Sequence, residues 1–465
     1  MSVGGEAGES RSYGRAAGVL TAALAATGLL TYGFFAVASH TLDPDQYGQI
    51  VVLWAVVFVL VATLFRPVEQ LLARTLAELD AGGGSRRRAL RIAATIQLGF
   101  ALAFAVAALA LRVPLEQDLL DGEALLFWVL VGSVLAFSAS FFLRGYLAGS
   151  RRFGLYATLV VVDGAARLAF ALAAAIGVAT GFDLIAIGIA VAPTLSIGVA
   201  LLAIRGATVG AVPAPRPPPE PARGAAVGAA PAPEMTFAHG GGFAAAVLVI
   251  MLSEQVFLNG GPLITRALDG PAAAGFIFNV LMVARAPVVV FQAIAASLLP
   301  HLTRLRSRGA AGAEAFDESV RLTVLVIGGL AVLAVLVVLA AGPALMQIAF
   351  GSDHTYDRVG LAIVAGGMGF YLSAATLNQA ALAQGQARRA AACWAGCAAL
   401  FVAWTFLPVL DVFRRVELGY AGGAALLCGL LYVLYRRPRA RPGDEVTPGS
   451  PEELEARLAA ADEAT

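Results

Sequence analysis

Three arginines lie inside stretches that are otherwise apolar enough to cross a membrane: Arg66, Arg167 and Arg285. A charged side chain at the centre of a bilayer costs at least about 2.5–3.5 kcal/mol, and proteins accept that cost where the charge faces a bundle interior or a water-filled cavity. A guanidinium offers several N–H donors in a fixed fork, which suits phosphate and diphosphate groups. The three arginines therefore predict a cavity that receives an anion.

Arg285 is predicted to lie near the middle of the membrane. It lies about 10 residues into its apolar segment, which is near mid-membrane at a rise of about 1.5 Å per residue. Glu254 sits at a similar depth in the preceding segment. Arg285 can therefore either form a salt bridge with Glu254 or face a cavity and contact phosphate or sugar; we favour the second interpretation.

Arg167 follows Asp163 by four residues, so both side chains lie on one face of a helix. An ion pair between them lowers the cost of both charges, and we favour this structural interpretation over a direct role in binding. A paired arginine still presents its outer N–H groups, so Arg167 also stays a candidate contact for a substrate.

Two further arginines are candidates on the inner side of the membrane. Arg66 is followed by Pro67, which predicts a helix kink, and by Glu69 one turn later. Arg66 either extends its head group to the membrane surface or binds the head group of a substrate. Arg144 lies at the inner end of a later apolar segment, where it is either an interface anchor or a substrate contact.

Uncharged polar residues and acids complete the candidate site. Asn259 and Asn279 can bind sugar hydroxyls, and hydrogen bonding between helices explains them equally well. The acids Asp163, Glu254 and Glu69 are candidates for coupling to an ion or for structural ion pairs. Acids are otherwise scarce in the apolar segments, which favours an anionic ligand over a cationic one.

The patterns of an enzyme are missing from the sequence. The 4 His are scattered without metal-ligand spacing, and the 3 Cys lie in apolar stretches. No phosphate-binding loop, dinucleotide fingerprint or nucleophile elbow occurs. We therefore expect no enzymatic activity, no metal and no cofactor, and we expect energy to come from an ion or potential gradient or from the cargo gradient.

Composition identifies the class of protein that must position these residues. The chain has 465 residues, of which 59% are hydrophobic and 14% charged, and its mean hydropathy is +0.79. A soluble domain usually carries about 25% charged residues. The composition therefore predicts an all-α polytopic membrane protein.

Twelve apolar segments reach the length of about 20 residues that a spanning helix needs. We predict them at residues 17–39, 49–72, 91–111, 124–147, 155–178, 184–204, 241–264, 275–299, 321–342, 359–383, 390–409 and 418–435. The predicted organisation is a disordered cytoplasmic tail (1–14), an N-lobe (15–204), a Pro-rich cytoplasmic linker (205–240), a C-lobe (241–436) and a cytoplasmic tail (437–465) with a short acidic helix at 451–462.

The arginines also predict the orientation. With the N-terminus in the cytoplasm, most arginines fall in inner segments, as the positive-inside rule requires, and both termini are cytoplasmic. Arg414 and Arg415 are the exception, because they fall in the last predicted outer loop.

The two halves look like a weak parallel repeat. Leu42 to Gly48 follows the first segment, and a similar stretch beginning Leu268-Asp269-Gly270-Pro271 follows the seventh. Six spans is an even number, so both halves enter the membrane from the same side and are related by an axis along the membrane normal. We expect binding at the interface between such repeats.

Several motifs resemble those of one known family. They are Leu42 to Gly48, Arg66-Pro67-Val68-Glu69-Gln70, Arg144 to Gly149 followed by Arg152-Phe153, Asn259-Gly260-Gly261-Pro262-Leu263, Ala274-Gly275-Phe276 and Leu299-Pro300. In order and placement they resemble polysaccharide-biosynthesis exporters of the multidrug/oligosaccharidyl-lipid/polysaccharide (MOP) superfamily, which have a fold similar to that of multidrug and toxin extrusion (MATE) transporters. The resemblance implies two six-helix pseudo-twofold lobes around a central cavity, alternating access, and an undecaprenyl-diphosphate-linked oligosaccharide as cargo.

The predicted function is therefore a flippase that moves this lipid-linked oligosaccharide from the inner to the outer leaflet of the plasma membrane. An ion-coupled multidrug antiporter of the MATE type would favour acids in its cavity, and a membrane-bound glycan synthase would need a large outer loop. A non-transporting scaffold for glycan synthesis is a further alternative. Expected partners are the lipid-linked glycan, membrane lipids and glycan synthesis enzymes; we expect a monomer that binds no nucleic acid.

Overall fold

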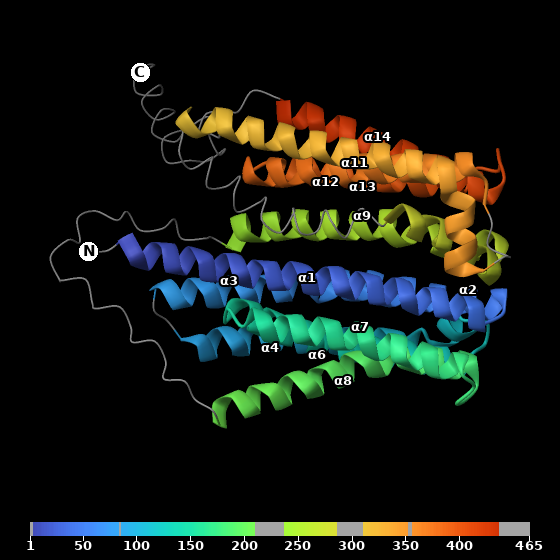
Figure 1. Ribbon diagram of the computed structural model, residues 1–465, viewed down its shortest axis with the longest axis horizontal. Coiled ribbons are helices and arrows are strands. Elements are labelled where there is room, and N and C mark those ends of the chain that lie inside the picture. The colour runs from blue at the N-terminus through green and yellow to red at the C-terminus, as the bar shows by residue number, and fades with distance from the viewer. Residues whose placement is uncertain (1–2, 83–84, 210–236, 286–309, 352–355, 437–465) are drawn as a thin grey trace, which may run out of the picture.

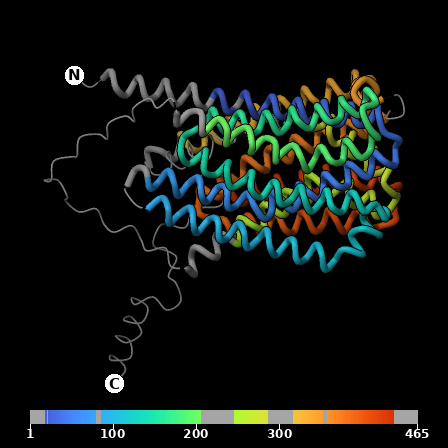
Figure 2. The backbone as a smooth tube through the Cα atoms, turned by 90° about the horizontal axis from the view of Figure 1, so that it is seen from below, coloured from blue at the N-terminus to red at the C-terminus, as the bar shows by residue number. Residues whose placement is uncertain are grey.

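A computed structural model of the chain describes residues 3–82, 85–209, 237–285, 310–351 and 356–436. Within these ranges the regular elements are helices. Most of the predicted linker and the predicted acidic helix at 451–462 lie outside the described residues. The helices lie roughly parallel to one long axis in both views (Figures 1 and 2).

The first half of the chain forms the N-lobe. Its long helices are α1 (Val3–Thr41), α2 (Pro44–Leu64), α3 (Arg66–Gly82), α4 (Arg86–Ala110), α6 (Ala124–Gly149), α7 (Phe153–Ala175) and α8 (Gly181–Val209). A short helix, α5 (Arg112–Pro114), and a π-helical turn, η1 (Leu115–Leu119), connect α4 to α6. Helix α1 starts within the segment 1–14 that was expected to be a tail, so the first helix extends beyond its predicted span.

The second half forms the C-lobe. Its helices are α9 (Phe237–Asp269), the helix Pro271–Arg285, α11 (Ala310–Phe350), α12 (Arg358–Ala383), α13 (Ala387–Thr405) and α14 (Val412–Arg436). In Figure 1 these helices, coloured from yellow-green to red, lie on one side of the molecule, and the blue and green N-lobe lies on the other.

The predicted fold class is confirmed. Ten helices of the described part are long and apolar enough to cross a membrane. The shorter apolar helix Pro271–Arg285 and the helix α13 lie at the two remaining predicted spans, and residues 286–299 of the predicted span 275–299 lie outside the described residues. Within the lobes α1 packs on α7 and α3 on α6, while α12 packs on α14 and α9 on α13.

The predicted kink at Pro67 is also present. Helix α2 ends at Leu64 and α3 begins at Arg66, and Phe65 between them has φ −108°. Proline has no N–H, so the carbonyl of Thr63 loses its helical partner, and the ring crowds that same carbonyl. Together α2 and α3 form one candidate span of 36 residues with Arg66 at its break.

Glycines allow α3 to approach α6 closely. A Cβ atom at Gly145 would lie 2.8 Å from the carbonyl oxygen of Glu69, and one at Gly149 would lie 2.7 Å from the Cβ of Leu76. The absence of side chains at these two positions therefore allows α3, with Glu69, to pack against the C-terminal part of α6.

Candidate functional site

A group of charged side chains lies inside the N-lobe between α3, α6 and α7; we call Glu69, Arg144, Asp163 and Arg167 the N-lobe charge cluster. Arg167 Nη2 donates a hydrogen bond to Asp163 Oδ2, as the four-residue spacing predicts. Arg144 Nη2, from α6, lies 3.6 Å from the same oxygen. One carboxylate oxygen therefore faces two guanidinium groups, one from its own helix and one from a neighbouring helix.

Aromatic rings hold both guanidinium groups in place. The Cζ atom of Arg167 lies 4.9 Å from the ring centroid of Trp54 and 6.0 Å from that of Phe137. The Cζ atom of Arg144 lies 4.8 Å from the ring centroid of Phe141. Cations within about 6 Å of a ring face are attracted to it. Ring faces thus stabilise the two cations in a segment where water is scarce.

The cluster keeps unused hydrogen-bonding capacity. Among the described residues, Arg144 Nε, Arg167 Nε and Asp163 Oδ1 are buried and have no hydrogen-bond partner. The ion pair is therefore not saturated: the carboxylate still has one free oxygen, and each arginine still has a free donor.

Glu69 connects the cluster to the kink between α2 and α3. Tyr156 Oη donates a hydrogen bond of 3.0 Å to Glu69 Oε1, which joins α7 to α3. Arg144 and Arg66 both act electrostatically on this carboxylate. Arg66 itself is exposed at the first position of α3. The structure thus brings Arg144 of α6 into the region of Arg66 and Glu69, which lie three residues apart at the start of α3.

Arg285, at the end of the described helix Pro271–Arg285, lacks an ion-pair partner among the described residues. Its Nε and Nη2 atoms are buried without a hydrogen-bond partner in that part of the chain. Its Cζ atom lies 5.9 Å from the ring of Phe278. Tyr32, Tyr371 and Tyr420 are close enough to interact electrostatically with it. The salt bridge to Glu254, which was one of the two interpretations of Arg285, is not formed.

Glu254, on α9, is partly buried and has neither an ion pair nor a side-chain hydrogen bond within the described ranges. Arg66 of the N-lobe and Tyr371 of α12 act on it electrostatically. This carboxylate is therefore under the electrostatic influence of both lobes, and its predicted role in ion coupling or ion pairing remains a prediction.

The two candidate asparagines are occupied by the protein itself. Asn259 Nδ2 donates to Gln255 Oε1 at 2.9 Å within α9. Asn279 Oδ1 accepts a hydrogen bond from the hydroxyl of Tyr47, which belongs to α2 of the N-lobe. Both asparagines are more than nine-tenths buried. In this conformation Asn279 joins α2 to the C-lobe, whereas Asn259 bonds only within its own helix, and the predicted contacts of both with sugar remain a prediction.

Tyr47 belongs to an interlobe contact that sequence reasoning did not identify. A Cβ atom at Gly48 would overlap the backbone carbonyl of Pro271, so α2 and the C-lobe touch there without a side chain between them. Deeper in the membrane, Tyr32 Oη donates to the carbonyl oxygen of Met282 at 2.5 Å. These contacts lie at the end of the bundle where α1 meets α2, and they join the lobes at that end.

A charge pair extends the interlobe contact into the loops. Arg266 Nη2, at the end of α9, pairs with Asp121 Oδ1 in the loop before α6. The only sequence signal for this end of the bundle is the repeated turn motif that follows the first and seventh spans.

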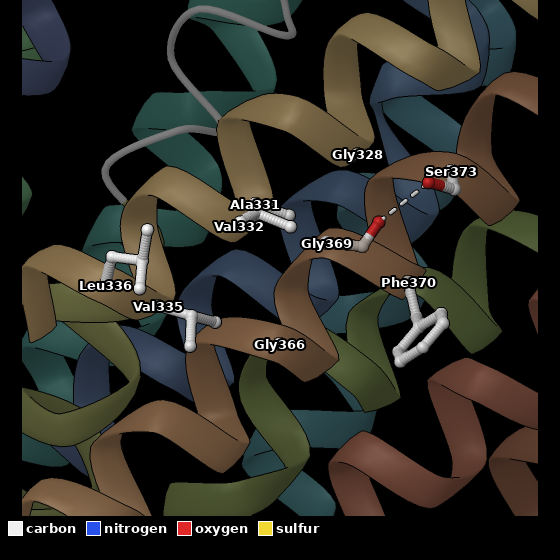
Figure 3. Close-up of a pocket in the computed structure, with 9 residues that line it drawn as sticks. All are labelled: Gly328, Ala331, Val332, Val335, Leu336, Gly366, Gly369, Phe370 and Ser373. Atoms are coloured by element: carbon white, nitrogen blue, oxygen red, sulfur yellow. Dashed lines mark hydrogen bonds between the residues drawn. The ribbon is translucent and has the colours of Figure 1, made fainter. Parts of the chain in front are cut away.

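A separate cavity of about 320 Å³ lies on the C-lobe between α11 and α12 (Figure 3). Its walls are Gly328, Ala331, Val332, Val335, Leu336, Gly366, Gly369, Phe370 and Ser373. The one hydroxyl among them, on Ser373, is hydrogen bonded to the carbonyl oxygen of Gly369. The cavity offers no charge or free donor to a phosphate, and the charged residues described above do not line it.

Comparison with known proteins identifies the fold. No protein-family model matches the chain, and no curated protein matches it. One similar structure is a MATE family transporter of the MOP superfamily, described as a multidrug resistance protein and solved in an inward-facing conformation. It superposes with a TM-score of 0.63 at 11% sequence identity, and the match covers 90% of this chain and 97% of that one. The MATE transporter ClbM, solved with Rb⁺, has a TM-score of 0.56 at 15% identity, over 96% and 97%. The Vibrio cholerae MATE transporter VcmN, solved in a bent form, has a TM-score of 0.52 at 15% identity, over 91% and 96%. The chain therefore has a MATE-like fold.

Proposed function

We propose that the protein is a membrane transporter that moves an undecaprenyl-diphosphate-linked oligosaccharide from the inner to the outer leaflet of the plasma membrane. The observation that carries this proposal is Arg285, at the end of an apolar helix, whose guanidinium has two buried nitrogen atoms that lack partners in the described part of the chain. A buried cation without a counter-ion is costly, so its retention favours a ligand that supplies the missing negative charge.

The distribution of charge over the two lobes supports a bridging anion. Arg66 lies on the N-lobe side and Arg285 on the C-lobe side. A diphosphate presents several acceptor oxygens to such donors, and arginine binds them through paired N–H groups. The glycan would then occupy the space on the inner side, and the polyprenyl chain would stay in the surrounding lipid.

The interlobe contact supports the direction of transport. It closes the end that contains the α1–α2 loop, which the distribution of arginines predicts to be the outer end. A transporter closed at that end accepts its cargo from the cytoplasmic side, with both termini in the cytoplasm. Release to the outer leaflet then requires that the contacts of Tyr47, Gly48 and Tyr32 with the C-lobe break.

Glu254 is the acid best placed to couple this cycle to an ion gradient. Asp163 is already paired with two arginines, and Glu69 accepts a hydrogen bond from Tyr156. Glu254 has no such partner among the described residues and faces Arg66 across the lobes. We propose that a proton or cation on Glu254 alternates with the electrostatic attraction to Arg66.

The unpaired Glu254 also favours a second candidate function, a MATE-type antiporter of cationic drugs. A free carboxylate in a spanning helix can bind an organic cation as readily as a metal ion or a proton. The fold is compatible with both functions, so the cargo must be tested directly.

The test is reconstitution of the purified protein into liposomes. We expect it to translocate a fluorescent undecaprenyl-diphosphate oligosaccharide. Under an imposed proton or Na⁺ gradient, a permeant cationic dye should cross the same liposomes no faster than it crosses protein-free liposomes. Gradient-driven dye transport without translocation of the lipid-linked glycan would contradict the flippase and support the antiporter. Protein-free liposomes and liposomes with heat-denatured protein are the matched controls.

A further inference from the structure

Within the N-lobe charge cluster, the guanidinium groups of Arg144 and Arg167 both lie within ion-pair distance of one carboxylate, that of Asp163. Asp163 and Arg167 are each 3% exposed. The two arginines do not share Asp163 equally. Arg167 makes a direct hydrogen bond to Oδ2, whereas Arg144 Nη2 stands 3.6 Å from it, beyond the usual hydrogen-bond range of about 2.7–3.2 Å.

The two arginines also differ in what can reach them. The side chain of Arg167 is 3% exposed and lies against Trp54 and Phe137. The side chain of Arg144 is 13% exposed and lies on Phe141 at the inner end of α6. A ligand that enters between α3, α6 and α7 therefore meets Arg144 and is kept from Arg167 by the packed aromatic side chains.

We propose that Arg167 is a positioning residue: its hydrogen bond occupies Asp163 Oδ2 and thereby holds Arg144 in a looser ion pair, 3.6 Å from that oxygen, in which the guanidinium of Arg144 can still bind a phosphate group. Arg144 is then the N-lobe phosphate contact, and Arg167 acts only through Asp163. The identification of the ligand as a phosphate rests on the proposed function. The competition of Arg144 and Arg167 for Asp163 does not depend on that function.

The second oxygen of the Asp163 carboxylate determines what Arg144 would do if Arg167 were removed. Asp163 Oδ1 is buried and lacks a partner in the described part of the chain. Without Arg167, both oxygens of Asp163 are available to Arg144, whose paired N–H groups fit a carboxylate in the bidentate geometry. Loss of Arg167 should therefore draw Arg144 onto Asp163 and remove it from the ligand.

Other groups around Arg144 do not replace Arg167. Glu69 acts electrostatically on Arg144, but its Oε1 already accepts the hydrogen bond from Tyr156. Arg66 acts on Glu69 as well, from the exposed end of α3. Asp163 is the acid whose carboxylate lies within ion-pair distance of Arg144 in the described part of the chain, so Asp163 is the acid for which the two arginines compete.

The test measures how accessible Arg144 is, without any cargo. The purified protein is treated briefly with phenylglyoxal, which modifies free guanidinium groups, and modification of Arg144 is quantified by peptide mass spectrometry. In Arg167→Leu we expect modification of Arg144 to fall about tenfold, the factor that corresponds to about 1.4 kcal/mol of added pairing with Asp163. In the double variant Asp163→Asn/Arg167→Leu modification should return at least to the level of the parent.

Two controls separate this effect from damage to the fold. Arg167→Lys keeps a cation beside Asp163 and should retain modification of Arg144 near the level of the parent. Modification of Arg74, an exposed arginine paired with Glu78, should be the same in every variant. Equal modification of Arg144 in the parent and Arg167→Leu, or low modification that persists in the double variant, would overturn the proposal.

The phosphate is tested separately with farnesyl diphosphate as a soluble prenyl diphosphate. It should protect Arg144 from phenylglyoxal in the parent and in the double variant, but leave the small residual modification of Arg167→Leu unchanged. If modification of Arg144 depends on Arg167 as described but farnesyl diphosphate protects in none of these proteins, the competition stands and the phosphate ligand is wrong. A failure of the liposome assay combined with protection would instead contradict only the proposed transport.

Discussion

The hydroxyl of Tyr47 in the N-lobe donates a hydrogen bond to the side-chain oxygen of Asn279 in the C-lobe, and both residues are 0% exposed. Both side chains are uncharged, and the two residues are 232 positions apart in sequence. This hydrogen bond ties the lobes together at the end that we predict to be outer. Any conformational cycle that opens that end must break it.

Tyr47→Phe should shift the protein toward conformations that are open at this end. The variant removes a hydrogen bond worth about 1 kcal/mol and leaves the Asn279 oxygen without its donor, so the closed conformation is penalised by about 1–3 kcal/mol. Spin labels on the α1–α2 loop and at the end of α9, measured by pulsed electron resonance, should show a larger population at long distance. Tyr432→Phe, on an exposed surface of α14, is the control. Identical distance distributions in the parent and Tyr47→Phe would show that the bond does not hold the lobes.

Gly48→Ala should separate the lobes more strongly. The added Cβ would overlap the backbone carbonyl of Pro271, which cannot rotate away as a side chain would. Alanine favours a helix by about 1 kcal/mol over glycine, so α2 itself should not be weakened. With the same spin labels the closed population should be lost, and transport should fall. Gly99→Ala, where a Cβ would meet nothing within 4 Å, should behave as the parent does. A closed population that survives in Gly48→Ala would contradict this packing.

Asp163→Asn should destabilise the N-lobe much more than the double variant Asp163→Asn/Arg167→Leu does. Removal of one partner of a buried ion pair leaves an uncompensated charge and typically costs about 3–5 kcal/mol, whereas replacement of both is often close to neutral. Thermal unfolding in detergent, followed by tryptophan fluorescence because Trp54 lies on Arg167, measures the difference. Equal losses of stability in the single and double variants would mean that Asp163 is needed for a reason other than Arg167.

Asp357, at the start of α12, should make a small contribution to stability that is lost at low pH. Burial by itself would raise the pKa of Asp357, but the hydrogen bond from the Gly360 N–H and the ion pair with Arg414 outweigh it, so its pKa lies below the ordinary value of 3.8. An acid whose pKa is lowered by folding stabilises the protein above its unfolded pKa and loses that effect as the pH falls through the lowered value. Asp357→Asn keeps a helix-capping side chain but removes the charge.

The variant should therefore melt below the parent at neutral pH, and this difference should vanish in acid below the pKa of Asp357. The effect is small because the Asp357 side chain is 43% exposed. Melting temperatures recorded against pH for both proteins provide the test. A difference that is constant across the acid range would assign the loss to the cap and not to the charge.

Local spacing predicted much of this architecture. The apolar segments correspond to the spans, Pro67 breaks the second of them, and Asp163 pairs with Arg167 at the four-residue spacing. Each of these features depends on residues close in sequence, where helix geometry alone fixes the neighbours. Arg414 and Arg415 were the exception to the positive-inside rule, and a local contact accounts for Arg415. Its side chain is buried and donates hydrogen bonds to the carbonyl oxygens of Thr405 and Leu407.

Contacts between helices could not be predicted in the same way. The second arginine on Asp163 comes from α6, and the donor to Asn279 comes from the other lobe. The interpretations of the polar residues therefore had different outcomes. Arg285 does not pair with Glu254, whereas Asn259 and Asn279 form hydrogen bonds within the protein. Which buried polar group finds which partner depends on helix rotation and tilt, and a single sequence carries little information on either.

We propose above that Arg285 binds the phosphates of a lipid-linked cargo. The most direct measurement is the initial rate at which a fluorescent undecaprenyl-diphosphate oligosaccharide crosses liposomes that contain the parent, Arg285→Gln, Arg285→Lys or Arg74→Gln. Loss of a charged hydrogen-bonding partner should cost about 1.5–3 kcal/mol, so Arg285→Gln should be slower by about 10- to 100-fold. Arg285→Lys should keep part of the rate, and Arg74→Gln, which changes an exposed surface arginine, should match the parent. An Arg285→Gln protein that is folded and translocates the cargo at the rate of the parent would contradict the claim.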